Sequence, residues 1–393
     1  MINRADYVSD RDWQNFLEFS QNLETPCIVF NLQAIKLNYQ RLKGLFPYSQ
    51  IYYAVKANPD REIVSMLAEL DSNFDIASPY ELDMVLSLGI SPERVSYGNT
   101  IKKARDVAYF YERGVRLYAT DSKEDLKSIA QNAPGSKIYV RILVEASSTA
   151  DWPLSRKFGC HQDMAYDLLI MARDLGLTPL GISFHVGSQQ RDIGQWDEAI
   201  AKTKYLFSSL EEDEGIKLSL INMGGGFPAP YTQPTNDLAE YAAEIQRYLL
   251  DDFGDDLPKI ILEPGRSLVG NSGILISEVV LISRKNNTAL NRWVYMDTGR
   301  FNGLIETLEE SIKYPIVTSK DAAGVREAEV ILAGPTCDSM DILYEDHKYR
   351  MPVDLKVGDR IYILSTGAYT ASYASVGFNG FPPIKTYIMK QEH

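Results

Sequence analysis

Short apolar segments recur along the first two thirds of the chain, and amphipathic segments separate several of them. The short segments are rich in β-branched and aromatic residues, which is typical of strands. They occupy residues 51–57, 74–77, 95–97, 116–119, 137–144, 181–186, 218–223 and 259–262. The amphipathic segments carry apolar residues on one face, which predicts helices at 61–70, 79–88, 123–131, 162–175 and 236–250. Ser78 and Ser122 precede two of these helices as N-caps, and Gly89 follows one as a C-cap.

The alternation of strands and helices predicts a (β/α)8 barrel over residues 32–266. A doubly wound open sheet would show a similar pattern. Eight strands in series favour closure into a barrel.

The pattern changes after Arg266. Strand-like segments at 274–283, 292–296, 327–333 and 360–364 are separated by turn residues, with little helical periodicity between them. Residues 267–393 are therefore expected to form a C-terminal β domain. The run 27–31 is also strand-like, so residues 1–31 are expected to join that domain and make it discontinuous.

Composition narrows the choice of partners and compartment. With 40 Lys and Arg against 53 Asp and Glu, the net charge is −13, which disfavours binding to nucleic acid. Cys27, Cys160 and Cys337 are too few for a disulfide framework, and their spacing suggests no metal site. The N-terminus lacks the apolar core of a secretory signal, and the uncharged stretches 218–236 and 361–384 are too rich in turn residues to enter a membrane. We expect a cytoplasmic protein without a membrane, metal or nucleic-acid partner.

Chemistry in a barrel lies at the C-terminal ends of its strands. The first predicted strand ends at Lys56, which is either a lysine at the rim or an amine that forms a Schiff base with a carbonyl. Asp75, at the end of the second strand, could pair with Lys56 or another cation. Arg141 lies within the fifth strand, and a buried arginine needs an anion such as Asp75 or a ligand.

His185 and Ser188 lie at the end of the sixth predicted strand. A lone histidine in a strand is more often structural, but sharing the strand-end layer with Lys56 favours a functional role. An imidazole can stack on a flat heterocycle, and a serine hydroxyl can bind a phosphate.

Three consecutive glycines, Gly224, Gly225 and Gly226, follow the seventh strand, and Glu263 and Arg266 end the eighth. Bare backbone N–H groups form a nest for an anion, and an arginine adds a second phosphate ligand. An amine, a stacking ring, a phosphate nest and a carboxylate together suit pyridoxal 5′-phosphate (PLP). A carboxylate at the pyridine nitrogen keeps it protonated and makes the ring a strong electron sink.

Seven short segments then show a family resemblance. YAVKAN, HVGSQ, GGGFP, EPGR, GPTCDSMD, GAYT and FNGF occur in this order between residues 53 and 381. In them the chain resembles the ornithine/lysine decarboxylases of the alanine-racemase-like, fold type III PLP-dependent family. The resemblance implies decarboxylation of L-ornithine, L-lysine or both to putrescine and cadaverine. It also implies a head-to-tail homodimer whose active sites are shared across the interface.

The resemblance assigns roles to individual residues. Lys56 carries the Schiff base, His185 stacks on the cofactor ring, and Glu263 binds its nitrogen. Cys337 of the partner subunit protonates the substrate carbon, and Asp338 binds the distal amine. The remaining cofactor-binding residues are Asp75, Arg141, Ser188, Gly224, Gly225, Gly226, Arg266 and Tyr369. Tyr314, Glu306 and Phe378 complete the expected substrate-binding set.

The residue that supplies a second carboxylate for the distal amine of the substrate is open. In eukaryotic relatives a Tyr-Asp pair ahead of GPTCD supplies it, whereas here that region reads FNGLIETLEESIKYP. Glu306, Glu309 and Glu310 are all alternatives, and a displaced acidic group would change the length of the pocket. Ornithine and lysine therefore both remain open as substrates.

Other functions within the same fold also stay open. Diaminopimelate and carboxynorspermidine decarboxylases are close alternatives, although Asp338 after the cysteine favours ornithine or lysine over diaminopimelate. An amino-acid racemase is disfavoured by Glu263, because racemases place an arginine at the ring nitrogen. A non-catalytic regulatory homologue is disfavoured because Lys56, His185, Arg266 and Cys337 are all present.

Overall fold

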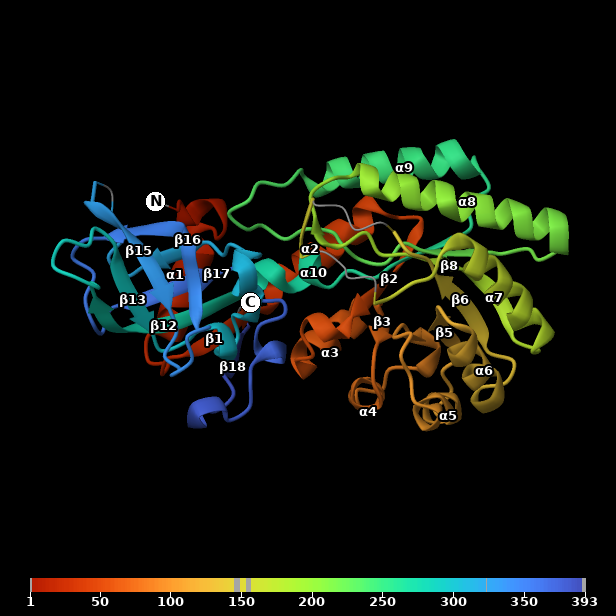
Figure 1. Cartoon of the computed structure of the whole chain (residues 1–393), viewed down its shortest axis with the longest axis horizontal. Helices are drawn as coiled ribbons and strands as arrows, with labels where there is room; N and C mark the ends of the chain where they lie inside the picture. Colours follow the sequence, from red (N-terminus) through yellow and green to blue (C-terminus); the bar gives the residue numbers. More distant parts are fainter. Residues whose placement is uncertain (1, 145–148, 153–156, 323, 391–393) are drawn as a thin grey trace. The chain divides into compact units, whose positions relative to one another are not determined.

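The computed structural model describes residues 2–144, 149–152, 157–322 and 324–390, which group into two compact units (Figure 1). The β unit comprises Met1–Ile35, Ala229–Pro234 and Leu268–His393. The barrel unit comprises Lys36–Pro228 and Thr235–Ser267. Both ends of the chain thus belong to the β unit, and most of the middle forms the barrel unit.

A closed barrel of eight parallel strands forms the centre of the barrel unit. Its strands follow chain order, and the ring closes where the last strand pairs with the first. They are β2 (Ser49–Ala54), β3 (Asn73–Ile76), β4 (Val95–Tyr97), β5 (Leu117–Thr120), β6 (Lys137–Arg141), β8 (Thr178–Ser183), β10 (Leu220–Asn222) and β11 (Lys259–Leu262). Each predicted strand overlaps one of these, which confirms the closed barrel.

One helix precedes the first barrel strand and others follow the later strands, and Figure 1 shows α4, α5, α6 and α7 in succession on the outside of the barrel. The helices are α2 (Leu32–Leu45), α3 (Arg61–Glu69), α4 (Pro79–Ser87), α5 (Ala104–Glu112), α6 (Lys123–Asn132), α7 (Gln162–Asp174), α8 (Gly194–Glu214), α9 (Leu238–Phe253) and the short α10 (Arg266–Val269). Ser78 and Ser122 accept hydrogen bonds from the backbone N–H groups of Glu81 and Asp125, which confirms both N-caps.

Side chains from several strands fill the barrel interior. Tyr52, Ala119, Tyr139, Leu220 and Ile261 form one buried cluster. Burial, followed by the charges of Glu263 and Asp75, raises the pKa of Tyr139 well above its usual value. The packed layer therefore lies next to the carboxylates at the strand ends, and it provides them with a rigid, desolvated floor.

One mixed sheet forms the core of the β unit. Its strands are β1 (Cys27–Asn31), β12 (Gly273–Ser283), β13 (Arg292–Met296), β14 (Ile316–Thr318), β15 (Glu327–Ala333), β16 (Ile342–Pro352), β17 (Arg360–Leu364) and β18 (Lys385–Met389). Strand β1 pairs antiparallel with β12 and parallel with β18, which confirms that the N-terminal strand joins this sheet. Helix α1 (Asp10–Ser20) packs Phe16 against the same core. The sequence pattern missed β14, β16 and β18.

Three barrel strands that lead to site residues end earlier than predicted. Strand β2 ends at Ala54, so Lys56 lies in the following 3-10 turn, Val55–Ala57. Strand β8 ends at Ser183, which places His185 in a loop and Ser188 at the start of β9 (Ser188–Gln190). That strand pairs with β7 (Ala150–Trp152) in a separate small sheet. Arg141 is the last residue of β6 rather than a residue in its middle. Apolar character continues past these points, whereas the regular strand ladder ends there and is followed by single bonds such as that from the Phe184 N–H to the Asn222 carbonyl.

Within the described part of the chain, no helix combines the length and apolar character needed to cross a bilayer.

Candidate active site

Lys56 and Asp75 form the first pair of site residues. Lys56 follows β2, and Asp75 lies on β3. Lys56 Nζ lies 3.3 Å from Asp75 Oδ2, so the predicted pairing is confirmed. The lysine side chain is 51% exposed, whereas that of the aspartate is only 5% exposed. Burial raises the pKa of Asp75, and the Lys56 ammonium opposes that rise. An accessible amine is thus held beside a buried carboxylate at the strand ends.

Gly98, directly after β4, packs against this pair. A β-carbon built there would lie 1.9 Å from Asp75 Oδ1, so a larger residue would displace the carboxylate. The sequence analysis missed Gly98. A glycine immediately following a predicted barrel strand was the available signal.

His185 presents a neutral ring. Its Nδ1 accepts a hydrogen bond from the Gly187 N–H at 3.1 Å, which places the proton of the neutral ring on Nε2. Burial, and then the positive charges of Arg141 and Lys56, hold the pKa of His185 well below its usual value. A flat, uncharged imidazole in a fixed tautomer suits stacking on a heterocycle.

Arg141 is also desolvated. Its guanidinium carbon lies 5.0 Å from the centre of the Phe158 ring, a cation–π distance. Burial lowers the pKa of Arg141, and the carboxylates of Glu263, Asp121 and Asp75 oppose this. The carboxylate that sequence reasoning offered as its partner, Asp75, instead lies within ion-pair distance of Lys56.

Glu263 follows β11 and is oriented by Asn222. The Asn222 side-chain N–H donates to Glu263 Oε1 at 2.5 Å, and Asn222 Oδ1 accepts from the Gly224 N–H at 2.9 Å. Burial and the charge of Asp75 raise the pKa of Glu263 to about 7. The carboxyl can therefore gain or lose a proton near neutral pH. Sequence reasoning missed Asn222, although it stands just before the three glycines.

The three glycines leave no room for side chains. Gly224 and Gly226 have φ of +62° and +106°, which favour glycine. A β-carbon on Gly225 would lie 2.7 Å from the Glu263 carbonyl oxygen and 3.3 Å from His185 Nε2. One on Gly226 would lie 2.7 Å from the Gly187 carbonyl oxygen. The glycine turn therefore meets the loops carrying His185 and Glu263 at close range.

Ser188 and Arg266 complete this side of the site. Arg266 Nε donates to Ser188 Oγ at 3.1 Å, and Arg266 is 3% exposed. Ser188 follows Gly187, whose carbonyl contacts Gly226. A buried cation, a hydroxyl and glycine backbone are the groups that hold a phosphate monoester.

Taken together, these residues fit PLP. The cradle at Gly225 would be filled by a β-carbon, and the donors around it suit a phosphate. The amine of Lys56 suits an aldehyde, and a carboxyl with a pKa of about 7 suits a pyridine nitrogen.

Cys337 and Asp338 lie in the β unit, in the loop between β15 and β16. Cys337 is exposed, and its backbone N–H donates to Asn379 Oδ1 at 2.8 Å. Asp338 is partly exposed and accepts from the Met340 N–H at 2.8 Å. The two side chains are thus adjacent on one loop.

Asp341 anchors this loop through hydrogen bonds. Sequence reasoning missed it, although it ends the GPTCDSMD motif. Its carboxylate accepts from the Thr336 N–H at 3.1 Å, the Thr336 hydroxyl at 2.7 Å and the Arg300 N–H at 2.8 Å. Asp341 is 3% exposed. The residue before Cys337 is therefore bound twice to one buried carboxylate.

Glu310 already has partners. Its carboxylate accepts the backbone N–H groups of Glu345, Asp346 and His347 at 2.6, 2.8 and 2.7 Å. Partial burial acts to raise the pKa of Glu310, but these N–H groups bring it below its usual value. Glu310 thus acts as a local cap, which makes it a poor choice for binding a substrate amine.

Four further predicted residues also lie in the β unit: Glu306, Tyr314, Phe378 and Tyr369. Glu306 and Tyr314 are fully buried, whereas Phe378 and Tyr369 are partly exposed. Their roles in binding stay predictions.

Comparisons with known proteins identify relatives over nearly the full length. The chain is 32% identical over 374 residues to the lysine/ornithine decarboxylase of Selenomonas ruminantium, covering 95% of this chain and 92% of the relative. The solved structure of lysine/ornithine decarboxylase from Vibrio vulnificus complexed with cadaverine has a TM-score of 0.87 at 25% identity, covering 98% and 100% of the two chains. The arginine decarboxylase of Paramecium bursaria Chlorella virus also has a TM-score of 0.87, at 27% identity and with 96% and 99% covered.

One relative is not named as a decarboxylase. The chain is 31% identical over 395 residues to antizyme inhibitor 2 of Xenopus laevis, covering 97% of this chain and 82% of the relative.

The family model described as pyridoxal-dependent decarboxylase, pyridoxal binding domain, matches residues 32–270. That segment contains Lys56, His185, the three glycines, Glu263 and Arg266. The chain belongs to the family of pyridoxal-dependent decarboxylases, and it is a PLP-dependent amino-acid decarboxylase.

Proposed function

We propose that this enzyme decarboxylates L-ornithine, L-lysine or both, and releases putrescine or cadaverine. The observation that carries the proposal is the half-exposed Lys56 amine beside Asp75, in the same barrel unit as His185, Glu263 and the glycine cradle. The relative from Selenomonas ruminantium is named for both amino acids, and the Vibrio vulnificus structure contains cadaverine. Asp338 next to Cys337 supplies a carboxylate suited to a distal ammonium.

The barrel residues hold the cofactor. Lys56 would bond its aldehyde, and the neutral ring of His185 would stack on its pyridine ring. The phosphate would be held by Ser188, Gly224, Gly225, Gly226 and Arg266 of the barrel unit, and the family resemblance adds Tyr369 of the β unit. When bound, PLP supplies an electron sink for the negative charge that develops on the substrate α-carbon as CO2 leaves.

Glu263 holds a proton at the pyridine nitrogen. Its pKa of about 7 shows that burial makes the ionised carboxylate costly, so a positive partner would be strongly favoured there. Asn222 fixes the direction of the carboxylate, and Gly224 in turn fixes Asn222. Asp75 orients Lys56 and balances its charge.

Cys337 of the partner subunit donates the proton to the α-carbon, and Asp338 of the partner subunit binds the distal amine of the substrate. This role is supported by the exposure of Cys337 and by the bracing of its loop through Thr336 and Asp341. A proton donor must be held within hydrogen-bond reach of the atom that it protonates, which a braced loop favours.

Product analysis tests the substrate. The holoenzyme is offered ornithine, lysine, arginine and diaminopimelate together, and the amines formed are identified. We expect putrescine, cadaverine or both, with arginine and diaminopimelate left intact. Agmatine as the main product, or release of lysine when diaminopimelate is offered alone, would overturn the proposal in favour of an arginine or diaminopimelate decarboxylase.

Two further outcomes of this assay bear on the alternatives. Carboxynorspermidine, offered separately, should be a poor substrate. Absence of CO2 release from every amino acid would favour the non-catalytic alternative, which the similarity to antizyme inhibitor 2 keeps relevant.

A mixing experiment tests the shared site. Lys56→Ala and Cys337→Ala are each inactive by expectation, but a mixed dimer contains one site with both residues intact. Random mixing forms such dimers in half of the pairs, so activity should recover to about a quarter of wild type. No recovery, with mixed dimers shown to have formed, would contradict a shared site.

We also propose a cytoplasmic location without nucleic-acid partners. The net charge of −13 disfavours contact with nucleic-acid phosphates, and three free cysteines, too few for a disulfide framework, suit a reducing compartment. Fractionation of cells that express the chain from its own promoter would test it.

A further inference from the structure

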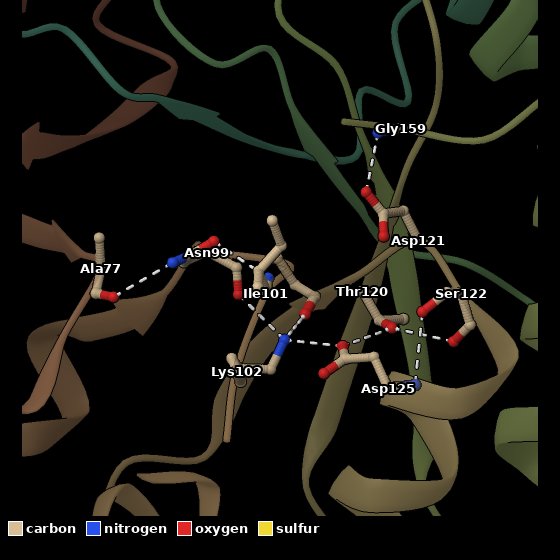
Figure 2. Close-up of polar contacts among 10 residues, drawn as sticks. Ala77, Asn99, Ile101, Lys102, Thr120, Asp121, Ser122, Asp125 and Gly159 are labelled. Carbon is tan, nitrogen blue, oxygen red and sulfur yellow. Dashed lines mark hydrogen bonds and ion pairs between the residues drawn. The ribbon is translucent and has the colours of Figure 1, made fainter. Parts of the chain in front are cut away.

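Lys102 is a fully buried lysine in the segment after β4, and the chemistry described above does not use it. Its side chain is 0% exposed. Its ammonium donates to three acceptors: Asp125 Oδ2 at 2.7 Å, the Ala119 carbonyl at 2.7 Å and the Asn99 carbonyl at 3.0 Å. Figure 2 shows Lys102 between Asn99 and Asp125. An ammonium has three donors, so all three are used. Burying a charge is costly unless it is paired in this way, which makes the cluster a specific arrangement.

The cluster links the segments that follow three neighbouring strands. Asn99, after β4, donates from its side chain to the carbonyl of Ala77, after β3, at 3.4 Å (Figure 2). Asp125, at the start of α6, also accepts from the Thr120 hydroxyl at the end of β5, at 2.8 Å. Removing Lys102 would therefore separate the segment after β4 from β5 and α6.

This linkage reaches the cofactor site through Gly98. That residue directly precedes Asn99, and its N–H donates to the Ile76 carbonyl at 3.2 Å. The α-carbon of Gly98 packs so closely against the Asp75 carboxylate that a β-carbon added to Gly98 would lie 1.9 Å from Asp75 Oδ1. The position of Gly98 therefore sets one wall of the space in which Asp75 faces Lys56.

The linkage also extends toward Arg141. Asp121, between Thr120 and the start of α6, accepts from the Gly159 N–H at 2.8 Å (Figure 2). Gly159 follows Phe158, whose ring lies 5.0 Å from the Arg141 guanidinium carbon. Segments on both sides of Lys102 thus touch residues of the site.

We propose that Lys102 is a positioning residue for cofactor binding, which acts through Asn99 and Gly98 to hold Asp75 opposite Lys56. The proposal rests on the proposed role of Lys56 in bonding the cofactor. It makes Lys102 responsible for the geometry of the site as well as for the stability of the barrel.

The experiment must separate positioning from stability. Lys102→Met removes the charge but leaves Asp125 buried and unpaired, which alone destabilises the fold. The double variant Lys102→Met, Asp125→Leu removes both charges, so it should recover thermal stability while the link from Asn99 to Ala119 stays broken.

Arg292 provides a matched control. It is a buried cation of the β unit whose guanidinium donates to the carbonyls of Val353, Met351 and Pro352 at 3.2, 3.1 and 2.8 Å. Arg292→Met removes a comparable set of bonds from the other unit. It should lower the melting temperature without affecting the cofactor site.

Three measurements are made on the full-length apoprotein: melting temperature, PLP affinity by absorbance titration, and hydrogen exchange of the peptide 95–103. A fourth is the share of cofactor trapped on Lys56 by borohydride, read by peptide mass. We expect both Lys102 variants to bind PLP about 10- to 100-fold more weakly, the range for a misplaced positioning group. The peptide 95–103 should exchange faster in both, and less cofactor should be trapped on Lys56. Arg292→Met should leave the PLP affinity, the exchange of the peptide 95–103 and the trapping on Lys56 unchanged.

A double variant that binds PLP as tightly as wild type, with normal trapping on Lys56, would overturn the proposal and leave Lys102 with stability alone. If Lys102→Met fails to fold, the double variant decides the question. Failure of the proposed role of Lys56 has a separate signature, because trapping would then occur on a different peptide in the wild-type enzyme.

Discussion

The barrel unit and the Cys337 loop of the β unit hold their proposed functional residues in different ways. In the barrel unit, Asp75, Glu263 and Arg266 are each bonded to another site residue or its direct support. On the loop, Cys337 is exposed, although its backbone N–H, Thr336 and Asp338 all form hydrogen bonds. The cofactor half of the site is therefore preorganised within one unit. The loop presents a braced but uncovered thiol, as expected of a group that acts on another subunit.

The three cysteines differ in exposure, although Cys27 and Cys337 both belong to the β unit. Burial raises the pKa of Cys27 to about 11 and that of Cys160 to about 12, which keeps both thiols protonated and unreactive. Cys337 alone among the three is exposed. Chemistry by a cysteine of this chain would therefore have to come from the β unit.

The largest expected effect follows from changing Lys56. Lys56→Ala should lose decarboxylation and the visible absorbance of the bound cofactor, because no amine remains to bond the aldehyde. Lys56→Arg is the matched control, since it keeps a cation beside Asp75 but cannot form the same bond. Lys56→Arg should retain the wild-type melting temperature within a few degrees, whereas Lys56→Ala should lower it because Asp75 is left buried without its cation. A Lys56→Ala protein that kept the absorbance band would refute the assignment.

Changing Cys337 should have the next largest effect. Cys337→Ala should bind PLP normally but decarboxylate about 10²- to 10⁴-fold more slowly, the usual contribution of a positioned proton donor. Misdirected protonation should also increase transamination as a side reaction, which product analysis would reveal. Cys160→Ala, which removes a buried thiol, should leave the products unchanged. An identical result in both variants would remove Cys337 from the mechanism.

Carboxyl groups of the two units should respond oppositely to pH. Glu263 has a pKa of about 7 in the folded barrel against an ordinary 4.5, so the folded state keeps a proton that the unfolded state loses. The free energy of unfolding of the apoprotein should therefore fall by about 3 kcal/mol as the pH rises from about 4.5 to 7, and Glu263→Gln should abolish this loss.

Glu310 of the β unit is the matched control for that measurement. Its pKa lies below its ordinary value, so its contribution to stability is present above about pH 4.5 and is lost as the pH falls through the folded pKa. Glu310→Gln should therefore destabilise the protein at neutral pH and have less effect in acid. Urea unfolding at several pH values checks both signs, and equal slopes for wild type and Glu263→Gln would contradict the first.

The smallest effect is expected from weakening the hydrogen bonds by which Asp341 anchors the Cys337 loop. Asp341→Asn weakens the bonds to Thr336 and Arg300 and should cost about 1–3 kcal/mol of stability. Activity should fall about tenfold with normal PLP affinity, because only the thiol is misplaced. Asp321→Asn disturbs a similar pair of bonds to Thr318 elsewhere in the β unit and should leave kcat unchanged. Equal loss of kcat in both would show that the brace has no specific link to Cys337.

Local patterns were sufficient for much of the fold. The eight barrel strands, the strand β1 and the caps Ser78 and Ser122 could be predicted because each depends on residues close together in the chain. The family resemblance added Cys337 and Asp338, for which the local sequence held only a weak signal. The residues at which strands end could not be predicted, because a strand ends where its neighbour stops pairing. Examples are Ala54 before Lys56 and Ser183 before His185.

By itself, the sequence determined the barrel, the discontinuous β unit and the kinds of chemical group at the strand ends. Only the tertiary structure decided which groups meet: Asp75 with Lys56, Asn222 with Glu263, and Thr336 with Asp341. It also decided that Lys102 is buried and Cys337 exposed. The physical reason is that partners and burial depend on contacts between segments distant in the chain, and these contacts also shift the pKa of Glu263.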